Sequence, residues 1–129
     1  MHSTSLKRIR LTLARSKDFP EGSTQIGYDL IAPLDDRGHI DLASWKAQRG
    51  ACTVRRFLPS EDDRFGRLVH KAGGAEHGYW AFDYDPNEES DDEPGFLFGI
   101  HVFAPGEYVS IRDADGAMHT FAVNSVNSL

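Results

Sequence analysis

Six histidines are the side chains of this 129-residue chain with the widest choice of chemistry. Near neutral pH a histidine can bind a metal ion, accept a proton or donate one. Two of them, His101 and His119, stand near other polar residues that could act with them, Glu107 and Tyr108. A pocket that brought these four side chains together could bind a metal ion or a small molecule, or support proton transfer.

A β-hairpin is predicted around the second of these histidines. Residues 107–112 and 117–123 alternate apolar and polar side chains on either side of a turn-forming segment. A three-residue loop over 114–116 keeps the apolar residues of both strands on one face, whereas a two-residue loop does not. Gly116 stands where such a loop needs the left-handed backbone conformation.

This register predicts where the hairpin side chains point. Ile111 pairs with His119, and Val109 pairs with Phe121, so that the apolar members form part of the core. His119 is then predicted on the core face. Its simplest role is that of a half-buried histidine bonded to a backbone carbonyl.

The chemistry of the histidines depends on how the strands are arranged. Convergence of His101, His119 and Glu107 at one end of a barrel is a hypothesis, because spacing between strands does not fix ligand geometry. His70 and Tyr79, on other expected strands, could join them. No P-loop, Cys-x-x-Cys, His-Glu-x-x-His or Gly-x-Ser-x-Gly occurs. The sequence therefore assigns no catalytic residue, metal ligand or cofactor, and it favours a protein without catalytic activity.

Short alternating segments separated by turns make up the rest of the chain. Strands are expected at 7–15, 25–34, 52–58, 67–71, 79–84 and 96–103, before the hairpin. Asp41 is placed to cap a short helix over 42–49 that Gly50 ends. We expect one mainly β domain over 1–129, a small β-barrel or strongly bent antiparallel sheet of about seven strands with one short helix.

The net charge of −6 is concentrated in one segment. Residues 83–94 contain seven acidic residues and no basic one, while the rest of the chain carries 13 acidic and 14 basic residues. We expect a flexible acidic loop at about 85–94, available to a basic protein partner. Its acidic members are Asp85, Glu88, Glu89, Asp91, Asp92 and Glu93.

Composition argues against several other classes of partner. The pI near 5.4 and the lack of a basic stripe with interleaved aromatics argue against nucleic acid. No apolar run is long enough for a membrane span or a signal-peptide core, so we expect a cytoplasmic protein with no membrane partner. The single cysteine, Cys52, cannot form a disulfide within the chain and is expected to be inert.

Several short segments resemble a family of small, uncharacterised bacterial proteins. They are Leu68-Val-His-Lys, residues 78–84 with the acidic segment that follows, residues 105–113, Asp115-Gly, and His119-Thr-Phe. The similarity runs from about Lys7 onward. That family carries no assigned activity, cofactor or substrate, so the resemblance implies a bacterial cytoplasmic protein and identifies no site residue.

Two functions follow from these observations. The favoured one is a non-catalytic β-barrel interaction module that binds a protein partner through the acidic loop. The alternative is a small-molecule or metal-binding protein, or a small enzyme, with a pocket at the barrel mouth that uses His101 and His119. The oligomeric state stays open.

Overall fold

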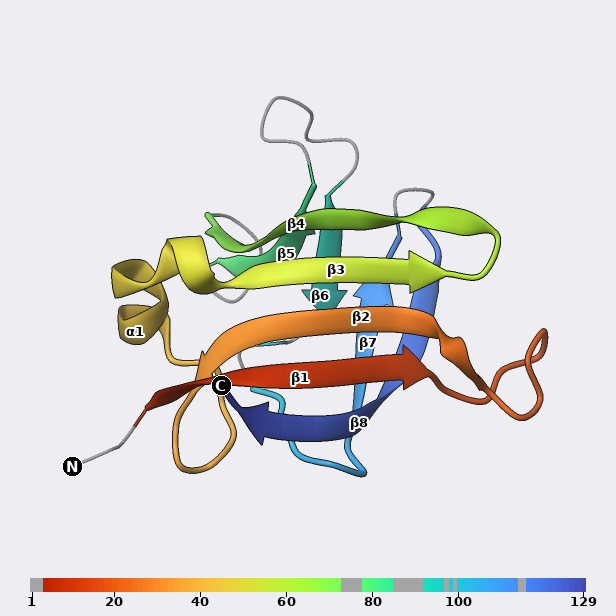
Figure 1. Cartoon of the computed structure of the whole chain (residues 1–129), viewed down its shortest axis with the longest axis horizontal. Coiled ribbons are helices and arrows are strands. Elements are labelled where there is room, and N and C mark those ends of the chain that lie inside the picture. Colours follow the sequence, from red (N-terminus) through yellow and green to blue (C-terminus); the bar gives the residue numbers. More distant parts are fainter. Residues whose placement is uncertain (1–3, 73–77, 85–91, 97, 99, 114–115) are drawn as a thin grey trace.

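Eight antiparallel strands follow one another around a closed barrel, and the last strand pairs with the first (Figure 1). The computed structural model describes residues 4–72, 78–84, 92–96, 98, 100–113 and 116–129. The strands are β1 (Ser5–Leu13), β2 (Ser23–Leu34), β3 (Thr53–Leu58), β4 (Glu61–Lys71), β5 (Tyr79–Asp83), β6 (Glu93–Phe96), β7 (Tyr108–Arg112) and β8 (Met118–Ser128). The mainly β fold is confirmed, with one strand more than the expected seven.

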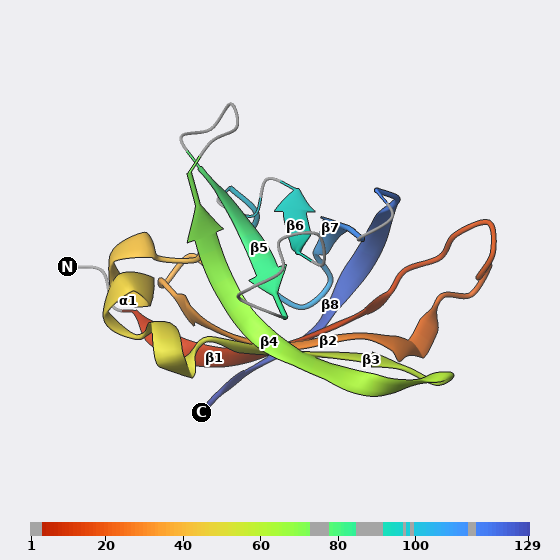
Figure 2. The same ribbon diagram turned by 90° about the horizontal axis from the view of Figure 1, so that it is seen from above.

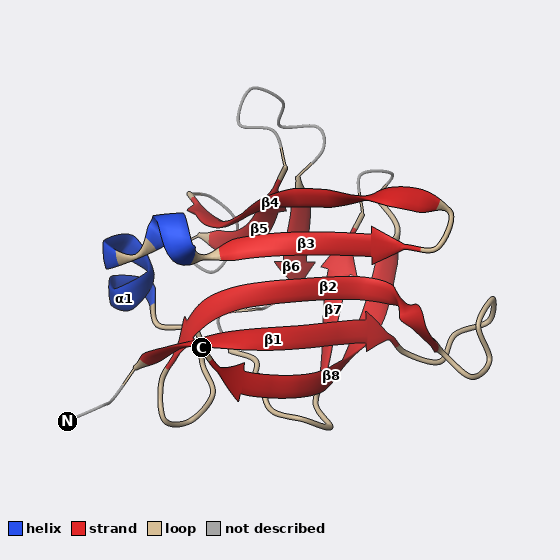
Figure 3. Ribbon diagram, viewed as in Figure 1, coloured by secondary structure: helices blue, strands red, loops and turns tan. Residues whose placement is uncertain are grey.

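One short helix, α1 (Leu42–Ala47), and a 3-10 turn, η1 (Arg49–Ala51), connect β2 to β3 (Figure 3). Asp41 caps the helix as expected, because its carboxylate accepts a hydrogen bond from the backbone N–H of Ser44 at 2.9 Å. Trp45 packs inward, and its indole N–H donates to the carbonyl of Leu68 at 2.9 Å. The helix therefore covers one end of the barrel.

Alternate side chains of every strand fill the barrel interior, as the two-residue period of a strand requires. The most deeply buried apolar residues include Ile9, Leu11, Leu30, Val54, Leu68, Phe82, Val109 and Ile111. They come from six strands, so the core forms only when the barrel closes.

The β7–β8 hairpin has the predicted register. Ile111 pairs with His119, and Val109 pairs with Phe121. The backbone N–H of Asp113 donates to the carbonyl of Ala117 at 2.9 Å, which closes a three-residue loop. Gly116 has a φ of 88°, the left-handed conformation predicted for it.

The prediction of a strand over residues 96–103 is wrong in its position. The structure places β6 at Glu93–Phe96, where Glu93 pairs with Phe82. Beyond it, the ring of Phe98 lies so close to Gly95 that any side chain there would collide with it. The missing side chain lets the chain turn back and bury Phe98 in the core. Residues 93 and 94, which the sequence assigned to the acidic loop, belong to β6 instead.

The connections between strands gather at two ends of the barrel. The β1–β2, β3–β4 and β7–β8 connections lie at one end, which we call the hairpin end. The β2–β3 connection with α1 and the β6–β7 connection lie at the other, which we call the helix end. Figure 2 shows the β1–β2 and β3–β4 hairpins on the right and α1 on the left.

Candidate functional site

A cavity of about 230 Å³ opens at the hairpin end, and we call it the mouth pocket. Its apolar lining comes from four strands and their ends: Leu13, Ile26, Phe57, Leu58 and Phe121. Its polar lining comprises Tyr28, Arg56, Asp113 and His119, with Ser16 and Asp18 from the β1–β2 connection. An apolar wall with a few convergent polar groups is the usual composition of a small-molecule site.

A buried carboxylate lies below the mouth pocket. Glu93 is only 2% exposed, and its Oε1 accepts hydrogen bonds from the hydroxyls of Tyr28 at 3.0 Å and Tyr84 at 2.5 Å. Its Oε2 lies 3.6 Å from Nε of Arg56. These contacts compensate the cost of burying the carboxylate, which would be several kcal/mol if it had no partner.

Strand pairing explains how these four side chains meet. Tyr28 and Arg56 stand directly opposite each other on β2 and β3 and point into the barrel. Glu93 points inward from β6, opposite Phe82, and Tyr84 follows β5 immediately. Four separate parts of the chain therefore contribute to one interior cluster.

Burial and charge determine the protonation of the cluster. Burial raises the pKa of the Tyr28 and Tyr84 hydroxyls, and the charge of Glu93 raises both further. Both tyrosines thus stay protonated at physiological pH and can donate to Glu93. Burial acts to lower the pKa of Arg56, but Glu93 and neighbouring groups outweigh it, so Arg56 stays charged.

Arg56 is the cation of this cluster that also lines the mouth pocket. Its side chain is 23% exposed, and the guanidinium carries five N–H donors in a planar fork. Nε faces Glu93, and the Tyr28 hydroxyl lies within the same cluster. Arg56 can therefore hold the Glu93 carboxylate and still offer donors to a bound molecule.

His119 lines the rim of the mouth pocket as one half of a histidine–aspartate pair. Its Nε2 lies 2.8 Å from Oδ2 of Asp113. This differs from the expected half-buried histidine bonded to a backbone carbonyl. The side chain is 45% exposed because residue 119 lies near the start of β8, beyond the core layers, and its partner comes from the hairpin turn. When neutral with Nε2 protonated, His119 presents Nδ1 as an acceptor.

The other three predicted site residues lie elsewhere. His101 and Glu107 belong to the β6–β7 connection at the helix end, whereas His119 is at the hairpin end. The length of β7 separates them, so the expected convergence does not occur. Tyr108 is 59% exposed on the outer face of β7, opposite Ala122.

The remaining histidine and tyrosine that could have joined the site also lie at the helix end. The His70 ring packs 4.8 Å from Trp80, and burial followed by the charge of Lys46 lowers its pKa. Tyr79 begins β5 opposite Lys71, far from the hairpin end along the strand. Among the described residues, no three His, Cys, Asp or Glu side chains are grouped as metal ligands.

The acidic segment divides into two parts. Asp85, Glu88, Glu89 and Asp91 lie outside the described residues. Asp92 forms an ion pair with Lys71, and Glu93 is inside the barrel. Glu93 is therefore a core residue and not part of a surface presented to a partner. The interaction-module hypothesis rests on the first four acids and stays a prediction.

Sequence reasoning missed Tyr28, Arg56, Tyr84 and Glu93 as members of one site. The sequence contained one signal of this site. Alternation along β3 places Arg56 on the same face as the core residue Val54. An arginine on a core face implies a buried partner. No comparable signal marked Glu93, which stands among other acids.

Comparison with known proteins gives no functional assignment, so the function has to be inferred from the residues described above. The chain matches no protein-family model, no curated protein and no solved structure. The resemblance to small bacterial proteins accordingly stays a prediction. Among the described residues, no helix combines the length and apolar character needed to cross a bilayer.

Proposed function

We propose that this protein binds a small amphipathic molecule in the mouth pocket without transforming it. The observation that carries the proposal is a cavity of about 230 Å³ whose apolar walls meet Arg56, Tyr28 and the His119–Asp113 pair. An eight-stranded barrel has an interior that is either filled by side chains or holds one small ligand. Here the core fills most of the barrel and leaves room at the hairpin end.

The size of the mouth pocket limits the ligand. Pockets that take drug-sized molecules have volumes of roughly 300–1,000 Å³. At about 230 Å³ the mouth pocket is smaller, which favours a compact molecule such as a single ring or a short chain. Leu58 and Phe121 would contact its apolar part.

The polar residues of the mouth pocket indicate how the ligand would be oriented. Arg56 offers N–H donors, which suit a ligand group that accepts hydrogen bonds, such as a carbonyl or a carboxylate. The tautomer of His119 that donates from Nε2 to Asp113 offers Nδ1 as an acceptor at the rim, which suits a hydroxyl or amine. Binding is favoured over catalysis because Tyr28, Tyr84 and Arg56 already occupy both oxygens of the buried carboxylate of Glu93.

Ligand-observed NMR on a small probe set tests the proposal. Saturation transfer from the protein to benzoate, benzamide and indole is measured for the wild type and two variants. Ile26→Trp fills the mouth pocket, whereas Leu42→Trp adds an indole at an exposed position of α1 at the helix end. We expect transfer to at least one probe with the wild type and Leu42→Trp, and its loss with Ile26→Trp. No transfer to any probe, or transfer that survives Ile26→Trp, contradicts the proposal.

The cellular setting belongs to the same proposal. A bacterial, cytoplasmic protein is inferred from the resemblance and from the lack of a long apolar run. The single cysteine, Cys52, is buried, and burial raises its thiol pKa, which suits an inert residue in a reducing compartment.

A further inference from the structure

The outer face of β1, β2, β3 and β4 carries a row of charged and aromatic side chains that the sequence does not reveal. Strand register places Arg10 opposite Asp29, Asp29 opposite Arg55, and Arg55 opposite Phe65. Neighbouring strands lie about 4.8 Å apart, so the row crosses the face without a break. Its members are up to 55 residues apart in the sequence, and the consecutive pairing of β1 with β2, β2 with β3 and β3 with β4 brings them together.

A second row runs beside the first. Arg8 stands opposite Ile31 on β1 and β2, and Thr53 stands opposite Arg67 on β3 and β4. Arg8 and Arg67 are exposed, and neither forms an ion pair with any residue in the described part of the chain. We call the two rows together the arginine face.

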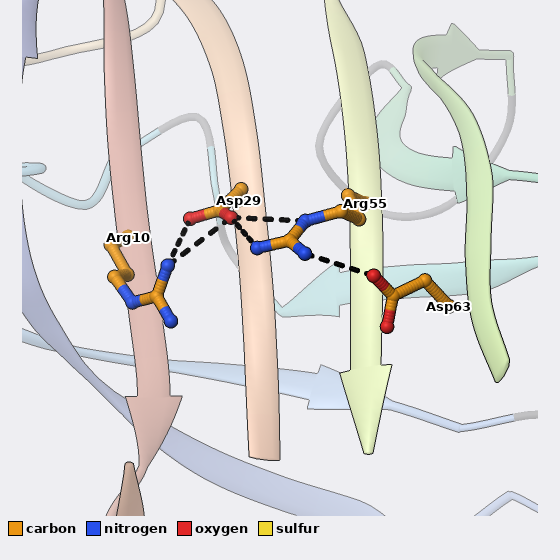
Figure 4. A network of polar contacts seen from close by, with 4 residues as sticks. All are labelled: Arg10, Asp29, Arg55 and Asp63. Carbon is orange, nitrogen blue, oxygen red and sulfur yellow. Dashed lines mark hydrogen bonds and ion pairs between the residues drawn. The ribbon is translucent and has the colours of Figure 1, made fainter. Parts of the chain in front are cut away.

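Two aspartates, Asp29 and Asp63, orient the two central arginines and balance their charge. Asp29 is shared by Arg10, with Nη1 3.1 Å from Oδ1, and Arg55, whose Nε lies 3.1 Å from Oδ2 (Figure 4). Asp63 accepts a hydrogen bond from Nη1 of Arg55 at 2.9 Å. The excess positive charge of the arginine face therefore comes from Arg8 and Arg67, with Asp83 on β5 standing opposite Arg67.

Aromatic rings complete the arginine face. The guanidinium carbons of Arg10 and Arg55 lie 4.6 and 5.1 Å from the centre of the Phe57 ring, which supports both groups from below. Phe65 is 68% exposed, the largest exposed fraction among the large apolar residues of the described chain. A hollow of about 350 Å³ lies between Arg8, Arg55 and Phe65.

We propose that the arginine face binds single-stranded nucleic acid. Proteins bind unpaired strands through a basic surface that follows the phosphates and through aromatic side chains on which bases stack. Phe65 would stack with one base in the hollow, and Arg8, Arg55 and Arg67 would contact the phosphates on either side. The arginine face lies on the side of the barrel and the mouth pocket at its hairpin end, and Phe57 borders both.

The exposed ring of Phe65 favours a nucleic acid over an acidic peptide. A peptide carboxylate is satisfied by arginine alone, whereas an exposed phenylalanine ring beside guanidinium groups also suits the flat surface of a base. The acidic pI does not oppose the proposal, because seven of the 20 acidic residues lie in segment 83–94. The sequence lacked a basic stripe because residues 8, 10, 55 and 67 belong to three different strands.

Fluorescence anisotropy with labelled oligothymidylate of about a dozen nucleotides tests the proposal at low ionic strength. Phe65→Ala removes the stacking ring and is expected to weaken binding by about five- to 150-fold, since stacking contributes about 1–3 kcal/mol per base. The double variant Arg8→Ala/Arg67→Ala should weaken binding and reduce the slope of affinity against salt. Tyr108→Ala, an exposed aromatic on β7, is the matched control and should bind like the wild type.

Three outcomes would overturn the proposal. The first is no rise in anisotropy at low salt. The second is equal loss of binding with Phe65→Ala and Tyr108→Ala, which would show that binding does not depend on the arginine face. The third is an unchanged affinity in Phe65→Ala together with equal binding of polyglutamate, which would show simple attraction of any polyanion. Because Phe65 and Tyr108 are exposed, thermal melting should show both variants folded like the wild type.

Discussion

Two hydroxyls and one guanidinium meet the carboxylate of Glu93 inside the barrel. In Glu93→Gln the tyrosines can still donate to the amide oxygen, but Arg56 loses its counter-charge. A hydrogen bond to a charged group contributes about 1.5–3 kcal/mol, so we expect a loss of roughly that size in the free energy of unfolding. Urea denaturation measures it.

The control for this prediction is Glu107→Gln. Glu107 is an exposed glutamate at the other end of the barrel, and the same substitution there should change the stability by less than about 0.5 kcal/mol. Equal effects of the two substitutions would mean that the Glu93 cluster does not stabilise the hairpin end.

The lowered pKa of His70 predicts that the free energy of unfolding depends on pH. Its pKa in the folded state is lowered by burial and by Lys46, so it stays neutral where the unfolded chain, with a pKa near about 6.5, already takes up a proton. The free energy of unfolding should therefore fall as the pH drops below about 6.5, until the folded state is protonated too. His70→Phe keeps the ring against Trp80 but does not titrate. Denaturation curves at several pH values should show a weaker dependence in this variant, and an unchanged dependence would refute the assignment.

At the residue scale, prediction from sequence succeeded where the cause was local. The register that pairs His119 with Ile111 depends on one turn and two adjacent strands, and it was correct. The partner of His119, Asp113, was not predicted. Side-chain geometry within the turn decides whether a carboxylate or a backbone carbonyl lies nearest to the ring. Glu93 was assigned to a surface loop, since its burial depends on tyrosines 65 and nine residues away.

At the scale of elements, β2 comes close to β1 at Gly27. A side chain there would collide with the carbonyl of Leu11 on the neighbouring strand β1. Gly27→Ala should therefore force β1 and β2 apart and cost about 1–3 kcal/mol, the usual cost of inserting atoms into a packed site.

Gly50 provides the comparison for Gly27. No atom lies within 4 Å of a Cβ added at Gly50, and its backbone is not in the left-handed region. Gly50→Ala should shift the melting temperature little, while Gly27→Ala lowers it by several degrees. The same shift in both variants would contradict the close approach between β1 and β2.

Element boundaries were predictable where turn residues mark them. The Asp41 cap and the β7–β8 hairpin follow from neighbouring residues and were correct. The position of β6 was not, because the apolar run after residue 95 looks like a strand. The run turns back since Phe98 packs against Gly95 and enters the core, a contact that alternation alone does not reveal.

At the scale of the whole molecule, the mouth pocket exists because the sheet closes, whereas the arginine face needs only the successive pairing of β1 to β4. β1 pairs with β8 across more than a hundred residues, with Lys7 opposite Ser128. Closure brings β2, β3 and β8 around the mouth pocket, and the order of β1 to β4 assembles the arginine face. The sequence predicted a barrel but not its strand register around the whole ring, so neither site could be derived from it.

Protein-observed NMR checks, residue by residue, the claim that the mouth pocket binds a small molecule. Backbone amide shifts are followed while benzoate, benzamide or indole is added to the intact protein. We predict that saturable shifts cluster at the hairpin end, around Ile26 and Tyr28 on β2 and around His119 and Phe121 on β8. Shifts that cluster instead at the helix end or on the outer face, or no saturable shift with any probe, would contradict the claim.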